Sequence, residues 1–220
     1  MPRRSQEREH RPVAEFITGL ASRVYEGQIK LPKFQREFVW TRGQIIDLLD
    51  SIARNYPIGS LLLWRRDLPL ASERAIAGLP IDPRDNKNVT AYLLDGCQRL
   101  STICGALHWE PDDPRSKWNL AYDLREERFL HREDLDDPPA HQVPLRFLTD
   151  PSAFFKRVTR LPEEQENRAE LLFNRFAQYE VAVVTLEATS ITEVGRIFER
   201  VNTRGTPLTT VEIVRAATWP

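Results

Sequence analysis

Apolar residues recur along the chain at two spacings, which separate the expected helices from the expected strands. The clearest helical stripe consists of Ile45, Leu48, Leu49 and Ile52. Thr41 and Gln44 precede it in the form of a capping box, which predicts that a helix begins after Thr41. Further helices are expected at residues 13–27, after Gly96, at 153–179 with a break near 161–162, after Ser190 and after Thr209.

Short apolar and β-branched runs predict the strands between these helices. Strands are expected at residues 60–64, 91–94, 118–124, 127–130 and 181–186, of which the third and fourth form a hairpin. Residues 29–40 are expected to be extended, because Pro32 disfavours a helical conformation at the residue before it. The polar, proline-containing stretches 65–90 and 131–144 are expected to be loops.

Composition narrows the class of protein. The chain has 220 residues, enough for one large domain or two small ones, and its 31 basic and 32 acidic residues nearly cancel. Any contact with nucleic acid must therefore be local. The two cysteines have no metal-ligand spacing and form no disulfide framework, which favours a reducing cytoplasm. An apolar leader and a run of about 18 apolar residues are both missing, so neither a secreted nor a membrane protein is expected.

The stretch LLDGCQRLST places a polar turn between a predicted buried strand and a predicted helix. A helix N-terminus binds anions such as phosphate, Gly96 permits close approach of the backbone, and Arg99 adds a planar cation. Asp95 has two interpretations, as a ligand of Mg²⁺ or as the cap of the helix. The structural alternative for the whole turn is that Asp95 only caps the helix and Arg99 is a surface side chain.

Cys97 also has two interpretations. At a helix N-terminus beside Arg99, a thiol with a lowered pKa would be a nucleophile. The alternative is a small side chain that fills space while its neighbours bind. Cys104 lies on the apolar stripe of the same helix and is expected in the core.

Two other loops carry candidate binding residues. In PKFQREFVW, Lys33, Gln35 and Arg36 alternate with aromatic residues, a pattern that holds phosphates and stacks a base. The alternative is a strand with its aromatic residues inward. In FERVNTRGTPL, Asn202 and Gly205 form a polar turn at a helix C-terminus, most simply a C-cap, with arginines near enough to reach a phosphate.

Taken in order, the FQR, DGCQR and NTRG elements with their flanks resemble the N-terminal domain of GmrSD-type and SspE-type restriction proteins. The resemblance covers residues 13–218 and implies a ParB/sulfiredoxin-like α/β fold, a small mixed sheet with flanking helices. Residues 1–12 are then a flexible tail and 13–220 one sensor domain. The chain stops soon after its last helix begins, so we expect that a C-terminal nuclease domain has been truncated.

The resemblance implies an enzyme that binds and hydrolyses an NTP, ATP or GTP with Mg²⁺, in prokaryotic defence against phage. Its DNA partner would be double-stranded and modified, by phosphorothioate or at cytosine. An HNH-type nuclease domain or subunit and further copies of the chain are the other expected partners. No nuclease activity is expected from this chain alone.

Carried over by motif, the catalytic residues would be Asp95, Gln98 and Arg99, with Asp95 also holding the metal. The nucleotide would be bound by Gln35, Arg36, Gly96, Cys97, Asn202 and Gly205. DNA would contact Lys33 and Arg36.

The sequence departs from the family pattern at Cys97, where the family has glutamine. Sulfiredoxins have their catalytic cysteine in this slot, which gives one alternative, thiol chemistry at Cys97. A second alternative is a ParB-like DNA-binding switch that binds nucleotide without turnover.

Overall fold

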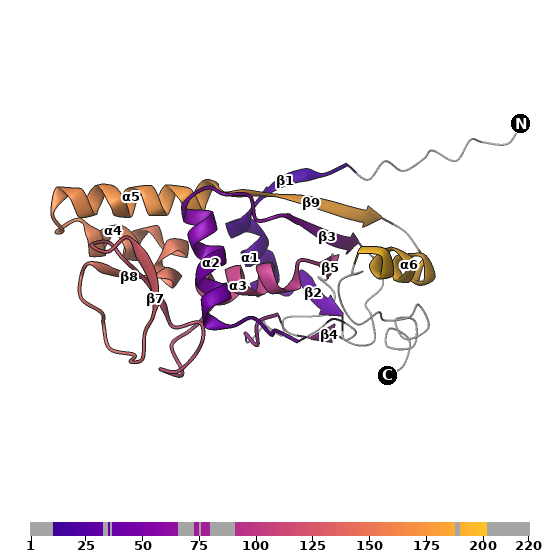
Figure 1. Cartoon of the computed structure of the whole chain (residues 1–220), viewed down its shortest axis with the longest axis horizontal. Coiled ribbons are helices and arrows are strands. Elements are labelled where there is room, and N and C mark those ends of the chain that lie inside the picture. Colours follow the sequence, from indigo (N-terminus) through magenta and orange to yellow (C-terminus); the bar gives the residue numbers. More distant parts are fainter. Residues whose placement is uncertain are drawn as a thin grey trace, which may run out of the picture.

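The computed structural model describes residues 11–32, 35, 37–65, 73–74, 76–79, 91–187 and 190–201. These residues form an elongated molecule, with a large sheet toward one end and a smaller sheet with two helices at the other (Figure 1). Helices α1 (Ile17–Tyr25), α2 (Arg42–Ala53) and α3 (Cys97–His108) lie in the middle. The predicted α/β class with a mixed sheet is confirmed. No helix in the described segments is both long and apolar enough to cross a membrane.

Within the described part of the chain, the large sheet has six strands in the order β1-β9-β3-β5-β2-β4. Their bounds are Val13–Phe16 (β1), Glu180–Glu187 (β9), Ser60–Arg65 (β3), Ala91–Asp95 (β5), Ile29–Pro32 (β2) and Glu73–Arg74 (β4). The central strands β3 and β5 are antiparallel, whereas β9 is parallel to β3 and β2 is parallel to β5. Because Leu62 pairs with Asp95, the start of β3 lies beside the end of β5.

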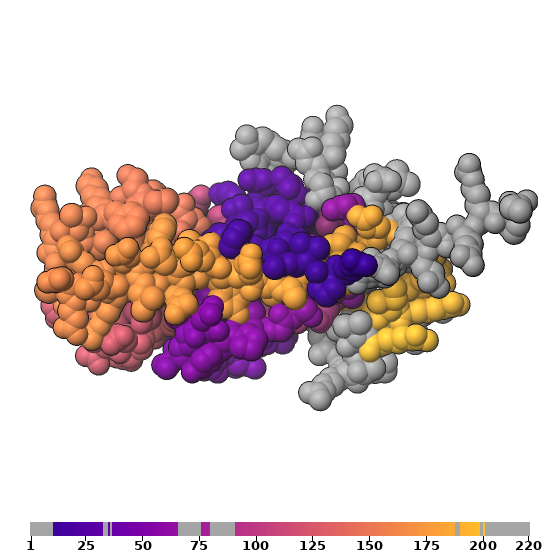
Figure 2. Space-filling view, turned by 90° about the horizontal axis from the view of Figure 1, so that it is seen from above, coloured from indigo at the N-terminus to yellow at the C-terminus, as the bar shows by residue number. Residues whose placement is uncertain are grey.

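Helices cover both faces of this sheet. Along β5, Leu93 faces a core that it shares with α1, α2 and α3, whereas Tyr92 and Leu94 face the opposite side. That side is covered by α6 (Ile191–Val201), whose Val194 is fully buried there. Seen from above, β1 runs along β9 at the surface, and α5 and β9 form one continuous band (Figure 2).

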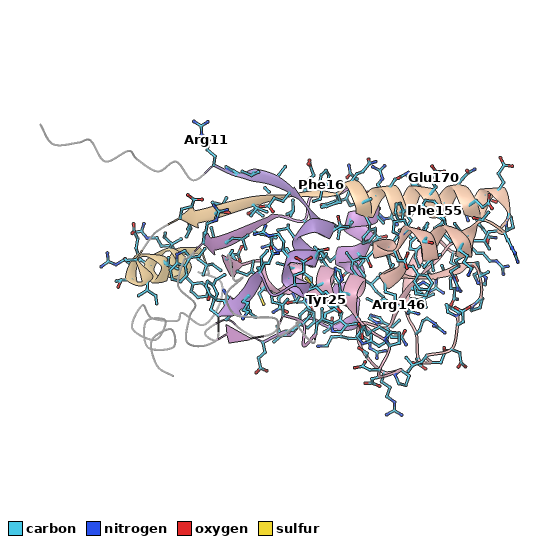
Figure 3. The ribbon with its side chains drawn as sticks, turned by 180° about the vertical axis from the view of Figure 1, so that it is seen from behind. Arg11, Phe16, Tyr25, Arg146, Phe155 and Glu170 are labelled. Carbon is cyan, nitrogen blue, oxygen red and sulfur yellow. The ribbon has the colours of Figure 1, made fainter. Side chains whose placement is uncertain are left out.

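The smaller sheet has the antiparallel order β7-β6-β8. Its elements and the helices beside it are β6 (Leu120–Asp123), β7 (Arg128–His131), β8 (Gln142–Pro144), the 3-10 helix η2 (Leu145–Thr149), α4 (Pro151–Val158) and α5 (Glu163–Gln178). The predicted hairpin is confirmed, and its turn is held by Asp123, whose carboxylate accepts from the N–H groups of Arg125 and Glu126. Phe155, Glu170 and Arg146 mark this end of the molecule in Figure 3.

The predicted helix start at Thr41 is confirmed. Thr41 Oγ1 accepts from the Gln44 N–H at 3.3 Å, and Gln44 Oε1 accepts from the Thr41 N–H at 2.9 Å, which completes the capping box. The four apolar residues of the predicted stripe are all buried. The cap at Ser190 is also confirmed, because Ser190 Oγ accepts from the Glu193 N–H.

Three expected elements differ from the structure. The expected loop 65–90 contains the two-residue strand β4, in which Arg74 pairs with Leu31. Residues 13–16 are strand β1 rather than the start of a helix, because Val13 pairs with Val183 at the edge of the sheet and the helix begins only at Ile17. The apolar residues of β1 happen to continue the helical spacing of α1. The expected loop 131–144 contains β8, whose Val143 is fully buried. A strand of three residues is too short to show a periodicity.

Candidate functional site

The DGCQR stretch lies where a buried strand turns directly into a helix, as predicted. β5 ends at Asp95, Gly96 is the N-cap residue, and α3 begins at Cys97. The alternative in which Asp95 caps the helix is therefore wrong. Gly96 has φ 91° and ψ 17°, a left-handed conformation that residues with a Cβ rarely adopt. Because the first N–H groups of a helix have no acceptor within it, this turn presents backbone donors beside Arg99.

Arg99 is held in place from two sides. Its Nη1 donates to the Ile58 carbonyl at 3.1 Å, and its Nη2 donates to Asp95 Oδ2 at 3.1 Å. The side chain is only 21% exposed, so the alternative of a loose surface arginine is wrong. A guanidinium has five N–H groups, and two of them have these partners.

Two glycines bring the backbone against the Arg99 guanidinium. Gly59, with φ 89°, stands just before β3, and a Cβ added there would overlap Nη1 of Arg99. A Cβ on Gly96 would overlap the Leu61 side chain and touch the guanidinium. Gly59 was not expected from the sequence as a site residue. Its signal is weak, a glycine two residues after Pro57 at the entrance to a buried strand.

Gln98 joins the first turn of α3 to the segment that follows the FQR element. Its Oε1 accepts from the N–H groups of Val39 at 2.9 Å and Trp40 at 3.2 Å, while its Nε2 donates to the Glu37 carbonyl at 3.0 Å. Both ends of the amide are therefore bound to backbone. These bonds give Gln98 a structural role, and its catalytic role stays a prediction.

Gln35 makes the reciprocal connection from the FQR element to β5. Its side chain is buried, with 8% of the residue exposed, and Nε2 donates to the Leu94 carbonyl at 2.6 Å. The Gln35 N–H donates to the Pro32 carbonyl, which turns the chain after β2. The structure thus brings the FQR and DGCQR elements together through two amide side chains. The nucleotide contact expected for Gln35 stays a prediction.

Cys97 is buried beneath the turn. Burial raises the pKa of its thiol above the ordinary value; Ser101 Oγ, 3.9 Å from the sulfur, lowers it, and the Asp95 carboxylate raises it again. The net direction is opposite to the lowered pKa that a nucleophilic thiol would need at neutral pH. Cys104 is fully buried in the core, which confirms its predicted place.

The remaining predicted residues lie outside the described ones. These are Lys33, Arg36, Asn202 and Gly205. Within the described ranges, no group of three or more His, Cys, Asp or Glu side chains could hold a metal ion. The Asp95 carboxylate is paired with Arg99.

The fold and the site together define an α/β domain in which the described part of the FQR segment meets the DGCQR turn where β5 leads into α3. A model of the GmrSD restriction endonuclease N-terminal domain matches residues 17–219, and the chain belongs to that family. It is therefore related to a component of restriction systems.

The chain also resembles a curated archaeal protein, the uncharacterized protein MJ0686 of Methanocaldococcus jannaschii. The two are 26% identical over an alignment of 239 positions, which covers 91% of this chain and 40% of the relative. The chain thus spans less than half the length of that relative.

Proposed function

We propose that this chain binds and hydrolyses a nucleoside triphosphate as the sensor domain of a restriction system that recognises modified DNA. The observation that carries the proposal is the fixed Arg99 guanidinium, which lies between Gly59 and Gly96 at the N-terminus of α3. A planar cation beside helix N–H groups, with no Cβ in the way, suits a phosphate group.

The residues around the turn fit a nucleotide with Mg²⁺ better than a resident metal. Mg²⁺ commonly keeps several waters and is held by one or two carboxylates together with the phosphates of a substrate. Asp95, whose side chain is 32% exposed, would supply the carboxylate. Bound Mg²⁺ would neutralise phosphate charge, and Arg99 and the N–H groups of the first turn would orient the phosphates.

A second function, nucleotide binding without turnover, is favoured by one observation. Both ends of the Gln98 amide are bound to the backbone of residues 37–40, so Gln98 is not placed to orient a water molecule. In this alternative the nucleotide acts as a switch on the segment that Gln98 holds.

We propose that modified double-stranded DNA contacts the FQR side of this site through Lys33 and Arg36. Support comes from the neighbouring segment, where Lys117 Nζ lies 4.5 Å from the centre of the Phe38 ring. A lysine at this place adds positive charge for contacts with the phosphate backbone of DNA. Cleavage would require a nuclease domain or subunit in addition to this domain.

One experiment separates these functions. Binding of and phosphate release from ATP, GTP, CTP and UTP are measured with Mg²⁺, alone and with phosphorothioated, glucosylated or unmodified DNA of one sequence. Release that one modified DNA stimulates supports the sensor NTPase. Binding without release under every condition supports the switch, and no binding of any NTP overturns both.

A further inference from the structure

Three basic side chains gather beside the segment that follows the FQR element. Arg42 is the first residue of α2, and Arg115 and Lys117 lie in the loop between α3 and β6. Arg42 Nη2 donates to the Arg115 carbonyl at 2.7 Å, which joins the start of the helix to the loop. Lys117 Nζ lies 4.5 Å from the centre of the Phe38 ring, which joins the loop to segment 37–42. We call these three side chains the basic patch.

The cations of the basic patch have no acidic partner. Among the described residues, none of the three forms an ion pair with a carboxylate. The two acids of the same loop contact other groups, because Asp112 accepts from the Nε1–H of Trp109 and Asp113 accepts from the Arg115 N–H. Since the basic and acidic residues of the whole chain nearly cancel, these unpaired cations produce a local positive potential that attracts an anionic surface.

The loop 109–119, which carries two of the three cations, is fixed by its neighbours. Asn119 is buried, and its Nδ2 donates to the Pro114 carbonyl at 3.2 Å. Trp118 is buried against α3, where a Cβ added to Gly105 would overlap its ring. The backbone of this loop is therefore ordered before a ligand arrives, which lowers the entropic cost of binding.

Arg42 is also held at its backbone, while its side chain can be reached from solvent. The capping box starts α2 at this residue, and His131 Nε2 donates to the Arg42 carbonyl at 3.2 Å. Arg42 and Arg115 are exposed, and Lys117 is half-buried. A large ligand can therefore approach the basic patch from outside without a change in the fold.

The phosphate backbone of DNA is the partner that fits these features. Arginine and lysine provide many of the contacts with backbone phosphates, which hold a duplex in register without reading its sequence. The basic patch adjoins segment 37–42, which continues the FQR element where a DNA contact is proposed. Interfaces with other proteins are instead depleted of lysine.

We infer that the basic patch binds the phosphate backbone of duplex DNA and supplies affinity that does not depend on the modification. The inference rests on the proposed DNA contact and adds a surface that lies outside the FQR, DGCQR and NTRG elements. Because these cations can contact the phosphates of any duplex, the preference for modified DNA comes from other residues.

The test neutralises the basic patch in the triple variant Arg42→Gln, Arg115→Gln, Lys117→Gln. Unmodified, phosphorothioated and glucosylated duplexes of one sequence are titrated by fluorescence anisotropy between about 50 and 200 mM salt. The affinity for every duplex should fall by about tenfold or more, with the ratio of modified to unmodified affinity unchanged. The slope of log K against log salt concentration should become shallower by about 2–3, since each lost phosphate contact removes about 0.9.

The matched control removes the same charge elsewhere, with Arg125→Gln, Arg128→Gln and Lys156→Gln. These residues lie at the hairpin turn and on α4, are exposed, and form no ion pair among the described residues. The control should change the affinity less than twofold and keep the salt slope. Lys117→Arg keeps the charge beside Phe38 and should keep the affinity. Thermal unfolding checks that every variant is folded.

Three results would overturn the inference. The first is an unchanged salt slope in the folded patch variant, and the second is an equal loss of affinity in the control. The third is tighter binding of single-stranded RNA of the same length, which would assign the basic patch to another nucleic acid. If the wild type binds no DNA of any kind, the proposed DNA contact itself fails, and the basic patch has no role in it.

Discussion

Arg99 and Arg168 make nearly the same bonds in two different regions of the molecule. Each donates through Nη1 to the backbone, Arg99 to one carbonyl and Arg168 to two, and through Nη2 to a carboxylate four residues earlier in the chain. Their side chains are similarly covered, with 21% and 27% exposed. Judged by hydrogen bonds alone, the two arginines would have the same role.

Their surroundings differ. Arg168 lies on α5, whose first turn carries Glu163, Glu164 and Glu166, and it also pairs with Glu127. Excess negative charge there opposes any anion. Arg99 pairs with Asp95 and lies against Gly59 and Gly96 at a helix N-terminus. The comparison teaches that the case for an anion at Arg99 depends on the backbone and charge around it rather than on its own bonds.

The largest effect is expected from removing each arginine in turn. Arg99→Ala should weaken NTP binding at least tenfold, since a hydrogen bond to a charged group contributes about 1.5–3 kcal/mol. Arg168→Ala should change NTP affinity less than twofold, although both variants should lower the free energy of unfolding by similar amounts. Calorimetric binding and urea unfolding measure the two quantities. Equal NTP affinities in the two variants would contradict the proposal that Arg99 and not Arg168 binds an anion.

The second largest effect on NTP affinity is expected from a substitution at Gly59, which lies against Arg99. Gly59→Ala places a Cβ against the guanidinium and should reduce NTP affinity severalfold, because Arg99 must move. Gly78→Ala is the control, since Gly78 also has positive φ but a Cβ there would meet nothing within 4 Å. Both variants incur the cost of a left-handed alanine, about 1–2 kcal/mol. Titration with NTP should show a loss of affinity in Gly59→Ala alone. A similar loss in both variants would contradict the importance of the close approach of Gly59 to Arg99.

The main effect of Gln98→Ala should be on the stability of the fold rather than on NTP hydrolysis. It removes three hydrogen bonds to the backbone of residues 37–40 and should lower the free energy of unfolding by about 1–3 kcal/mol. Gln98→Glu keeps the acceptor for the N–H groups of Val39 and Trp40 and should lose less. Thermal unfolding and protease cleavage within 37–40 report this loss. An alanine variant of full stability that lacks turnover would instead support a catalytic Gln98.

The smallest effect is expected at Cys97. Because burial raises its pKa, the thiolate fraction at pH 7 should lie below that of an ordinary thiol. Iodoacetamide should therefore react slowly with the native chain, faster as the pH rises, and fast at neutral pH only in urea. Mass spectrometry of the modified peptide measures this rate. Rapid native modification at pH 7, or lost NTP binding in Cys97→Ser, would return thiol chemistry to consideration.

Much of the fold could be predicted because its signals are local. The capping box at Thr41 and the apolar stripe after it specify α2, and the polar turn at Gly96 marks the junction of β5 with α3. Strand β1 could not be separated from α1, because its position depends on pairing with β9, which lies far away in the sequence.

The candidate site was predicted less completely, because many of its contacts join segments that lie far apart in the sequence. Asp95, Gly96 and Arg99 are contiguous in sequence, so their grouping follows from one turn. The contacts of Gln35 and Gln98 with backbone, and of Gly59 with Arg99, join segments far apart in the chain. Residue type shows that an amide can hydrogen-bond but not which partner the fold brings to it.

Leu94 contacts or adjoins three parts of the molecule. Its side chain packs in the cluster with α6, its carbonyl accepts from Gln35, and the next residue is Asp95. A shift of β5 at this point therefore displaces the FQR element, the Arg99 turn and the helix that leads to the NTRG element together. A ligand bound at the turn would therefore be coupled to the position of α6 through this strand, without direct contact between them.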